Sequence, residues 1–290
     1  MKNILSLVVL LLLGACAFAQ NPVTPDTTKK AKIKKTPPKD GFSVRVDIDS
    51  GVMVKYPDIR EEDVFYSKRI WREIDLRDTI NSVLKAENAK LIDVLLEAIG
   101  NEELRTFSNK DTTAGRVLED NDSFKIELTA KQALESARGI REGEADSTGK
   151  IGEPTLGKLR SDDFQKYRIK EDWVLDSKRS VFEPRIIGIA PMKQVEGNWQ
   201  PVFWIYYEDA REILSKKKLV NPSNDASTLT FDDFFVRRLF ASYIIKETNP
   251  ANKSIIDILG QVDPKDPRKL YESERIKKSI SDFEQSLWEY

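Results

Sequence analysis

The stretch YRIKEDWVLDSKRSVFEPRIIGIAPMKQVEGNWQPVFWIYY, residues 167–207, decides the fold. It contains three of the five tryptophans of the chain and two apolar runs, residues 186–189 and 202–207, in a sequence of which 33% is charged. Two short polar connections, residues 176–178 and 196–198, divide the stretch into three segments. Connections of this length join neighbouring antiparallel strands, so the stretch predicts a meander that forms the core sheet.

The predicted strands of this meander cover residues 167–175, 181–192 and 199–207. A second region of alternating apolar and polar residues lies upstream, at residues 42–48 and again at residues 52–56. Alternation with a period of two is typical of a half-buried strand, so this region predicts a hairpin or two short edge strands.

Helical patterns surround the meander. The spacing of Val64, Trp71 and Ile74 predicts a helix over residues 61–78, with acidic residues at its positive N-terminal end. Further helices are predicted at residues 89–99, where Gly100 ends the helix, from the cap at Thr129 to Arg138, and at residues 208–218, 231–247 and 267–288. Helices against one face of an antiparallel sheet make an α+β fold.

The predicted helix at residues 231–247 is apolar on almost every side. Such a helix is buried over most of its surface, either inside its own domain or against a partner. The predicted C-terminal helix has only a narrow apolar stripe, formed by Ile276, Ile280, Phe283 and Leu287. This stripe fits packing on its own domain or on a neighbouring helix, and the sequence leaves both choices open.

Glycines punctuate residues 139–160, a segment that contains almost no large apolar side chain. Long loops in compact domains are either functional or disordered. We therefore expect a mobile glycine-rich loop near residues 139–160, inside a single domain that covers residues 41–290.

The N-terminus has the order of a secretory signal peptide. Lys2 precedes an apolar run at residues 4–13, and Ala17-Phe18-Ala19 supplies a small-residue cleavage site. The run is too short to span a bilayer. The competing interpretation is a lipoprotein signal, Leu13-Gly14-Ala15-Cys16, whose cysteine is acylated and retained. The position of the cleavage site favours removal of residues 1–19, and both interpretations export the protein.

Residues 20–40 combine lysine and proline with no aromatic residue, which predicts a disordered linker. The linker is either a plain spacer or a tether attracted to anionic lipid headgroups or cell-wall polymer.

The remaining chain is long enough to bury a substantial core. Because Cys16 is the only cysteine, that core must be stabilised by burial and hydrogen bonding rather than by a disulfide. No basic stripe interleaved with aromatics suggests a nucleic-acid partner.

The chain contains no histidine. This excludes Ser-His-Asp triads, Cys-His dyads and histidine zinc sites, and it removes the usual proton shuttle near neutral pH. No cysteine remains after the signal peptide, so thiol catalysis and cysteine metal sites are excluded as well. We expect no enzymatic activity, no metal and no organic cofactor.

Three short segments match known functional motifs weakly, and the sequence around each one does not support the match. Residues 152–158 copy most of a phosphate-binding loop, but Leu159 replaces the Ser or Thr that binds magnesium, and no apolar strand precedes the motif. Ser82 and Lys85 fit the S-x-x-K of penicillin-binding enzymes without its companion motifs, so a surface pair at a helix end is the better interpretation. Residues 47–51 resemble the start of a calcium loop whose later ligands are missing, which favours a turn.

Paired carboxylates could serve as acid and base in glycan hydrolysis. They occur at residues 162–163, 208–209 and 232–233, each at or just before a predicted helix start. Acidic side chains at these positions accept hydrogen bonds from free backbone N–H groups and interact favourably with the helix dipole. Capping is therefore the preferred interpretation, and catalysis the alternative.

Long stretches of the sequence resemble the GldN/PorN family. The matching stretches are YRIKEDWVLDSKRSVFEPRIIGIAPMK from Tyr167, PVFWIYYEDAREIL from Pro201, FDDFFVRRLFASYIIKE from Phe231, VFYSKRIWREIDLRDTIN from Val64 and the terminal FEQSLWEY. The resemblance covers most of residues 55–290 and is interrupted by a poorly matching insert near residues 140–160. Matches of this length are far more specific than a short motif.

The resemblance implies a periplasmic subunit of the type IX secretion and gliding motility machinery. Family members assemble into rings with an outer-membrane lipoprotein, GldK/PorK, in contact with inner-membrane motor proteins of the GldL/GldM (PorL/PorM) type. Because large aromatics and arginines dominate interface energetics, we select candidate interface residues from these types, while expecting some of them to belong to the core. They are Trp173, Arg179, Arg185, Trp199, Trp204, Phe235, Arg237, Arg238 and Phe240.

Two rival functions remain open at this point. One is a periplasmic cell-wall hydrolase that uses only carboxylates, serine and lysine, with Asp162, Asp163 and Ser82 as its candidates. The other is a glycan-binding module that uses exposed tryptophans.

Overall fold

The computed structural model of the protein describes residues 55–287, apart from residues 88, 111–121, 142–154, 196, 221–228, 261–262 and 264–265. The chain divides into two units, Met1–Val44 and Arg45–Tyr290, and every described residue lies in the second. The predicted signal peptide, the linker and the alternating segment at residues 42–54 lie outside the described residues. The second unit has the predicted α+β fold, with helices packed on an antiparallel sheet.

The strands are β1 (Val64–Asp75), β2 (Thr106–Phe107), β3 (Glu127–Leu128), β4 (Ile140–Arg141), β5 (Thr155–Leu156), β6 (Phe164–Asp176), β7 (Val181–Val195), β8 (Asn198–Pro201), β9 (Ile205–Tyr206) and β10 (Tyr243–Glu247). The α-helices are α2 (Leu91–Gly100), α3 (Ala130–Arg138), α4 (Tyr207–Lys216), α5 (Phe231–Val236), α6 (Ile255–Ile258) and α7 (Arg268–Ser286). Short 3-10 helices are η2 (Glu61–Asp63), η3 (Thr79–Lys85) and η4 (Ser161–Asp163).

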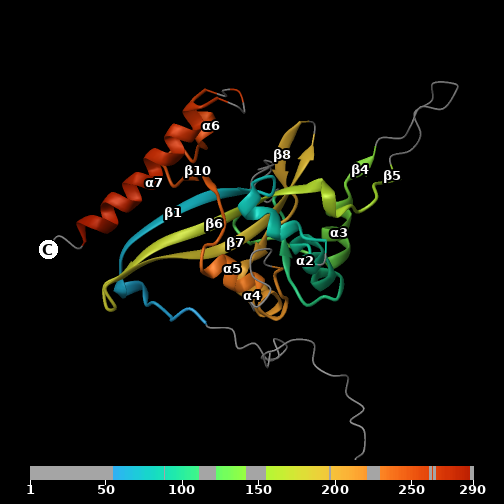
Figure 1. The fold of residues 1–290 in the computed structure, drawn as a ribbon, viewed down its shortest axis with the longest axis horizontal. Coiled ribbons are helices and arrows are strands. Elements are labelled where there is room, and N and C mark those ends of the chain that lie inside the picture. Colours follow the sequence, from blue (N-terminus) through green and yellow to red (C-terminus); the bar gives the residue numbers. More distant parts are fainter. Residues whose placement is uncertain are drawn as a thin grey trace, which may run out of the picture. The chain divides into compact units, whose positions relative to one another are not determined.

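The main sheet has the order β10-β1-β6-β7-β8, with β9 also paired to β7 (Figure 1). The long hairpin of β6 and β7 confirms the predicted antiparallel meander. Its third predicted strand is divided into β8 and β9, because the chain leaves β7 between them. There Trp204 exchanges two backbone hydrogen bonds with Phe107 of β2, at 2.8 and 2.9 Å, and its side chain enters the core.

The predicted helix at residues 61–78 is wrong. Only η2 is helical, and β1 follows it as a central strand between β6 and β10. From Ile70 onward both faces of β1 are buried, so the strand shows no alternation of apolar and polar residues in its sequence. The charged residues that suggested the solvent face of a helix are buried in ion pairs: Arg72 contacts Glu171, and Glu73 contacts Lys166 at 3.2 Å.

The predicted helix at residues 231–247 is also wrong in its second half. Helix α5 ends at Val236, and Arg238 adopts a left-handed backbone with φ of 55°, after which the chain continues as strand β10. Asn81 of η3 holds the turn, because its side-chain amide donates to the Ala241 carbonyl at 2.9 Å and accepts from the Ala241 N–H at 2.9 Å. The segment is apolar on all sides because a helix and a strand bury different faces of it.

The other predicted helices are confirmed with small shifts at their ends, as α2, α3, α4 and α7. Thr129 caps α3 through the predicted capping interaction, reinforced by Gln132. Helices α2 to α5 gather on one side of the sheet, and α7 lies along β10 at its edge (Figure 1). Ser273 of α7 accepts a hydrogen bond from the Ile244 N–H at 2.8 Å, so the helix satisfies part of the edge strand.

Most of the predicted glycine-rich loop, residues 142–154, lies outside the described residues. Its two ends are ordered as the antiparallel strand pair β4 and β5. Gly157 follows β5 and packs so closely on the end of α3 that a side-chain Cβ at this position would lie 2.7 Å from the Arg138 carbonyl oxygen. The close approach brings the residues after β5 to the end of α3.

Candidate interaction surface

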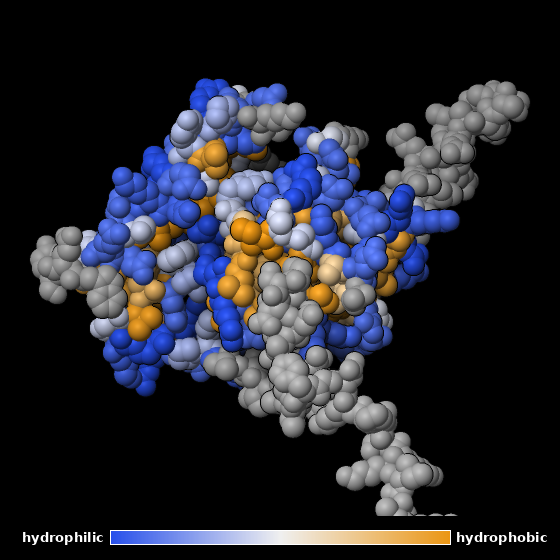
Figure 2. Space-filling view, viewed as in Figure 1, coloured by the Kyte–Doolittle hydropathy of each residue, from blue (hydrophilic) through white to orange (hydrophobic). Residues whose placement is uncertain are grey.

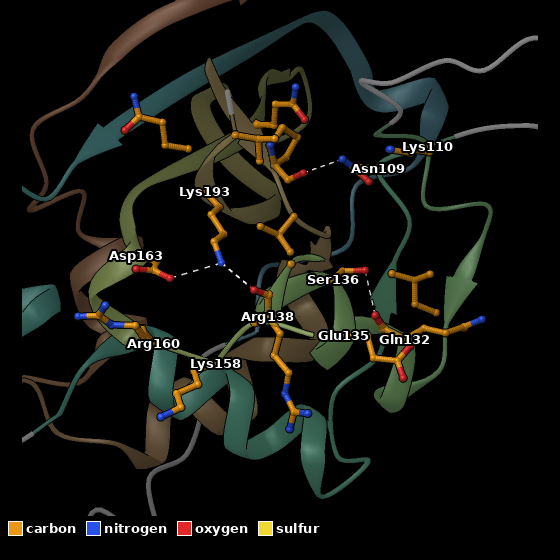
Figure 3. Close-up of a pocket in the computed structure, with 18 residues that line it drawn as sticks. Asn109, Lys110, Gln132, Glu135, Ser136, Arg138, Lys158, Arg160, Asp163 and Lys193 are labelled. Atoms are coloured by element: carbon orange, nitrogen blue, oxygen red, sulfur yellow. Dashed lines mark hydrogen bonds and ion pairs between the residues drawn. The ribbon is translucent and has the colours of Figure 1, made fainter. Parts of the chain in front are cut away.

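A cavity of about 880 Å³ lies where α3 and β5 meet the ends of β7 and β8 (Figure 3). Its lining includes the apolar side chains of Leu128, Val195 and Val202. Cationic side chains line the rest more often than anionic ones: Lys110, Arg138, Lys158, Arg160 and Lys193, against Glu135 and Asp163. We call this the basic cavity.

Lys193 lies inside the basic cavity and is held by protein groups. Its ammonium donates to the Ala137 and Arg138 carbonyls at 3.2 and 3.0 Å and pairs with Asp163 at 3.4 Å (Figure 3). The last carbonyls of a helix lack intrahelical partners, and the C-terminal end of the dipole is negative, so a lysine stabilises the end of α3. Lys193 and Asp163 therefore neutralise each other and contribute no net charge.

The remaining cations of the basic cavity have no ion-pair partner among the described residues. Within the described part of the chain, Lys110, Arg138, Lys158 and Arg160 make no ion pair, and all are exposed. Arg138, Lys158 and Arg160 lie below Lys193 in Figure 3. The cavity thus combines exposed cationic side chains with apolar ones, a combination that suits an anionic group attached to an apolar one.

At the opposite ends of β6 and β7 lies the acidic helix η2, beside a turn that itself carries the exposed Lys178. The backbone N–H of Ser177, in the turn between these strands, donates to the Asp63 carbonyl at 2.9 Å, which places η2 beside the turn. Glu61 and Asp63 form no ion pair within the described residues, and Glu62 pairs only with the exposed Arg60. We call η2 together with Phe65 the acidic end.

Phe65 is 75% exposed, the most exposed large apolar side chain of the described residues. It borders an apolar groove of about 380 Å³ that is also lined by Leu175, Val181, Phe182 and Leu287. Figure 2 shows an apolar patch here, beside the end of α7 and the start of β1. An exposed aromatic ring on a polar exterior marks an interaction surface more often than a scattered aliphatic residue does.

The structure brings Trp173, Arg238 and Phe240 together around the buried carboxylate of Glu171. Glu171 is fully buried and accepts hydrogen bonds from Arg72, from Arg238 at 2.7 Å and from the Trp173 indole at 3.0 Å. The Arg238 guanidinium also lies 5.7 Å from the Trp173 ring and 5.3 Å from the Phe240 ring. This cluster connects strands β1 and β6 to the segment after α5.

Arg179 and Arg185 also lie together, because both pair with Glu183 at 2.9 Å. Arg185 donates to the Pro57 carbonyl at 2.7 Å, and its guanidinium stacks on the Tyr56 ring at 5.3 Å. These contacts anchor the first described residues of the chain along the start of β7. Arg185 therefore fixes a segment of its own chain, whereas Arg179 pairs with Asp176 and Glu183 around the turn.

The other candidate interface residues are scattered. Trp204 is 1% exposed and Phe235 is 0% exposed, so both are core side chains, as the sequence allowed. Trp199 packs against Lys166, whose ammonium lies 5.4 Å from the ring. Arg237 is exposed and pairs with Asp233 at 3.5 Å.

The paired carboxylates are engaged in structure. Asp233 completes a capping box with Thr230, as predicted, and Asp209 in the first turn of α4 pairs with Arg105 at 2.7 Å. Asp162 pairs with Lys90 at 2.9 Å. Asp232 is not a simple cap, because it accepts hydrogen bonds from Tyr207 and Arg211 inside the core, both at 3.0 Å.

Two buried groups, Glu73 and Tyr243, have pKa values that move away from neutrality, whereas the pKa of Lys170 moves towards it. Burial raises the pKa of Glu73, but Arg168 and Lys166 lower it by more, so the carboxyl stays ionised. Burial and the neighbouring Glu73 raise the pKa of Tyr243 far above its usual value. Burial lowers the pKa of Lys170, opposed by Asp122, which pairs with it at 3.2 Å. A general acid or base needs a pKa near the working pH, and these groups have permanent partners instead.

The weakly matching motifs have structural roles wherever their residues are among those that the structure describes. Ser82 donates to the Thr79 carbonyl at 2.6 Å inside η3, and Lys85 is exposed. Lys158 follows the short strand β5 and is followed by η4 rather than by a long helix, which does not fit a phosphate-binding loop. Residues 47–51 lie outside the described residues. No group of three or more potential metal ligands occurs in the described part of the chain.

Comparison with known proteins agrees with the resemblance. A family model described as gliding motility associated protein GldN matches residues 59–289. The chain belongs to the GldN family. It is therefore a protein associated with gliding motility and type IX secretion. No curated protein matches the chain. Among the described residues of this GldN family member, no helix combines the length and apolarity needed to cross a bilayer.

Sequence reasoning missed the basic cavity and the acidic end. Lys158 and Arg160 were considered only as parts of a failed phosphate motif and a loop, and Phe65 was assigned to a helix. The two basic residues Lys158 and Arg160 were visible in the sequence, but the acidic pair at residues 162–163 follows them, so they give no clear signal for the cavity. The acidic run Glu61–Asp63, with Phe65 two residues after it, was visible too, but its exposure depends on the tertiary fold.

Proposed function

We propose that this GldN family member is a non-catalytic, periplasmic structural subunit of the type IX secretion and gliding motility machinery. In this proposal it binds a GldK/PorK-like outer-membrane lipoprotein, associates with further copies of itself in a ring and contacts GldL/GldM-like inner-membrane motor proteins. The lipoprotein holds it at the outer membrane, and no cofactor takes part.

The family match over residues 59–289 carries the proposal. The described ionisable residues support its non-catalytic part, because Glu73, Glu171 and Asp232 are each enclosed by permanent cationic or hydroxyl partners. The exposed surface supports its assembly part. It combines the large cationic cavity at one end of the strands with the aromatic and acidic surface at the other, and each is the kind of feature that marks an interface.

The test is purification of the native protein from the cell envelope under mild detergent. We expect it in a large complex that contains an outer-membrane lipoprotein, and we expect a gene deletion to block type IX secretion. A matched control is the envelope of the deletion strain complemented with the wild-type gene, which must restore both results. Recovery of the protein as a lone monomer, with secretion intact in the deletion strain, would refute the proposal.

An activity screen separates this proposal from the hydrolase alternative. Purified mature protein is incubated with peptidoglycan and with casein, and the products are analysed by mass spectrometry. Cleavage that is lost on Asp162→Asn or Ser82→Ala would replace the structural role with an enzymatic one.

A further inference from the structure

We propose that copies of this protein bind one another head to tail, with the acidic end of one copy, Glu61–Asp63 and Phe65, inserted into the basic cavity of the next. This inference rests on the proposed function and deepens it, because it names the two surfaces that meet when copies associate. The occupant of the cavity is thus a second copy of this chain.

The two surfaces lie at opposite ends of the same strands. The basic cavity is lined by residues next to the start of β6 and at the end of β7, including Asp163 and Val195. The acidic end contacts the turn that joins the end of β6 to the start of β7. A strand of 13 residues separates them by roughly 40 Å at about 3.3 Å per residue. One copy therefore cannot fill its own cavity with its own acidic end.

The charges of the two surfaces are complementary. Arg138, Lys158 and Arg160 line the cavity, are exposed and have no ion-pair partner within the described residues. Glu61 and Asp63 of η2 are likewise without an ion pair in the described part of the chain. Opposite potentials steer the correct pairing and disfavour contact between two acidic or two basic ends.

The apolar parts of the two surfaces correspond as well. Phe65 lies two residues after the acidic residues and is 75% exposed, and the lining of the cavity includes Leu128, Val202 and the 44% exposed Val195. A single aromatic anchor in a concave apolar site, surrounded by charged residues, is the usual arrangement of an interface hot spot. The cavity volume of about 880 Å³ accommodates such a side chain together with the residues of η2.

The head-to-tail contact determines which kind of assembly the copies form. When a surface contacts a different surface on the next copy, the contact is heterologous, and repeated contacts produce a closed ring or an open filament rather than a dimer. Two identical apolar grooves meeting face to face would instead give a symmetric dimer.

The experiment uses cysteine crosslinking in native cells. Because Cys16 is the only cysteine and lies within the predicted signal peptide, engineered cysteines react without background. Ser67→Cys, on the same exposed face of β1 as Phe65, and Val195→Cys are introduced singly and together, so that the Phe65 ring is kept, and isolated envelopes are treated with a bis-maleimide crosslinker. We expect the double variant to give a ladder of multimers and each single variant to remain uncrosslinked. Dimers from Ser67→Cys alone would overturn the proposal in favour of a face-to-face contact.

Charge reversal provides an independent arm on the same double-cysteine background. Glu61→Lys with Glu62→Lys should abolish the ladder, Arg138→Glu with Lys158→Glu should abolish it too, and all four substitutions in one chain should restore it. Glu274→Lys and Lys278→Glu on the exposed face of α7 are the matched controls and should leave the ladder unchanged. All substituted residues are exposed, so thermal midpoints should match that of the parent.

The outcomes separate this inference from the proposed function. If the native protein is found in large complexes with its lipoprotein but the double variant gives no ladder, the head-to-tail contact is wrong and the proposed function stands. If the native protein is a lone monomer, the proposed function and the contact are both refuted. A ladder that survives both charge reversals also overturns the assigned surfaces.

Discussion

Replacing Glu171 with alanine should destabilise the protein more than any surface substitution. Its carboxylate is fully buried, and it is the shared partner of Arg72, Arg238 and the Trp173 indole. Removing the carboxylate leaves the Arg72 charge, whose side chain is 8% exposed, without its partner. Breaking a buried ion pair in this way costs about 3 to 5 kcal/mol. In a domain of 150 to 250 residues each kcal/mol shifts the thermal midpoint by about 2 to 4 °C, so the expected fall is roughly 6 to 20 °C.

The same carboxylate predicts a pH dependence. Burial alone would raise the pKa of Glu171, but Arg72 and Arg238 lower it by more, so the folded-state pKa lies below the ordinary value of 4.5. A group with a depressed pKa stabilises the fold above its unfolded-state pKa, and the stabilisation is lost as the pH falls through the folded-state value. Stability should therefore decrease on acidification below about pH 4.5, and Glu171→Gln should weaken this decrease.

Thermal unfolding of the mature protein, followed by near-UV circular dichroism between pH 3 and pH 7, measures both effects. The matched control is Asp172→Ala, the neighbouring residue, whose partner Arg69 is 43% exposed, although the pair is bidentate at 2.6 and 2.8 Å. A pair of this exposure contributes about 0 to 1 kcal/mol. The reasoning is refuted if Glu171→Ala lowers the midpoint no more than Asp172→Ala does, or if Glu171→Gln leaves the acid limb of the stability profile unchanged.

Three further changes have defined outcomes. Asn81→Ala should lower the unfolding free energy by about 1 to 3 kcal/mol, because the buried carbonyl of Asp75 and the half-buried backbone groups of Ala241 lose their partner; urea denaturation measures this, and an unchanged free energy of unfolding would contradict it. Phe235→Asp should yield unfolded or aggregated protein, since the side chain is 0% exposed, and a soluble folded monomer on gel filtration would show that the site tolerates a charge. Thr129→Ala should lower the free energy of unfolding by about 0.5 to 2 kcal/mol through loss of the α3 cap, and Ser136→Ala, at an exposed position of the same helix, should lower it by less. Equal thermal unfolding midpoints in the two variants would argue against the cap.

The parts of the fold that were predictable from sequence are those in which local signals and tertiary structure agree. Strands β6 and β7 follow from their apolar runs and from the polar turn at residues 176–180, where Ser180 has φ of 53°. Helix α3 follows from the Thr129 and Gln132 capping box, because the cap depends only on residues near one another in the sequence. In both cases the information needed lies within a few residues of the element itself.

Strand β1 and the turn after α5 were not predictable in this way, because distant residues decide them. Glu73 is acceptable inside the sheet only because Lys166, Arg168 and Tyr243 come from other strands to pair with it. The helix expected at residues 231–247 breaks where Asn81, 160 residues earlier, binds the backbone of Ala241. A buried polar group satisfied across the sequence has no local signature, so periodicity assigns such residues to a solvent-exposed face.

The same reasoning applies to the candidate interface residues, which remain a prediction. Selecting tryptophans and arginines by residue type gave Trp204, which is core, and Arg185, which pairs with Glu183 and holds residue 57 of its own chain. What distinguishes an interface residue is an unfulfilled interaction, and that property appears only after internal partners have been assigned. Lys158 and Arg160 keep free charge and Phe65 keeps an exposed ring after that assignment in the described part of the chain. The residues best placed to bind another molecule are therefore those for which the protein's own fold provides no partner.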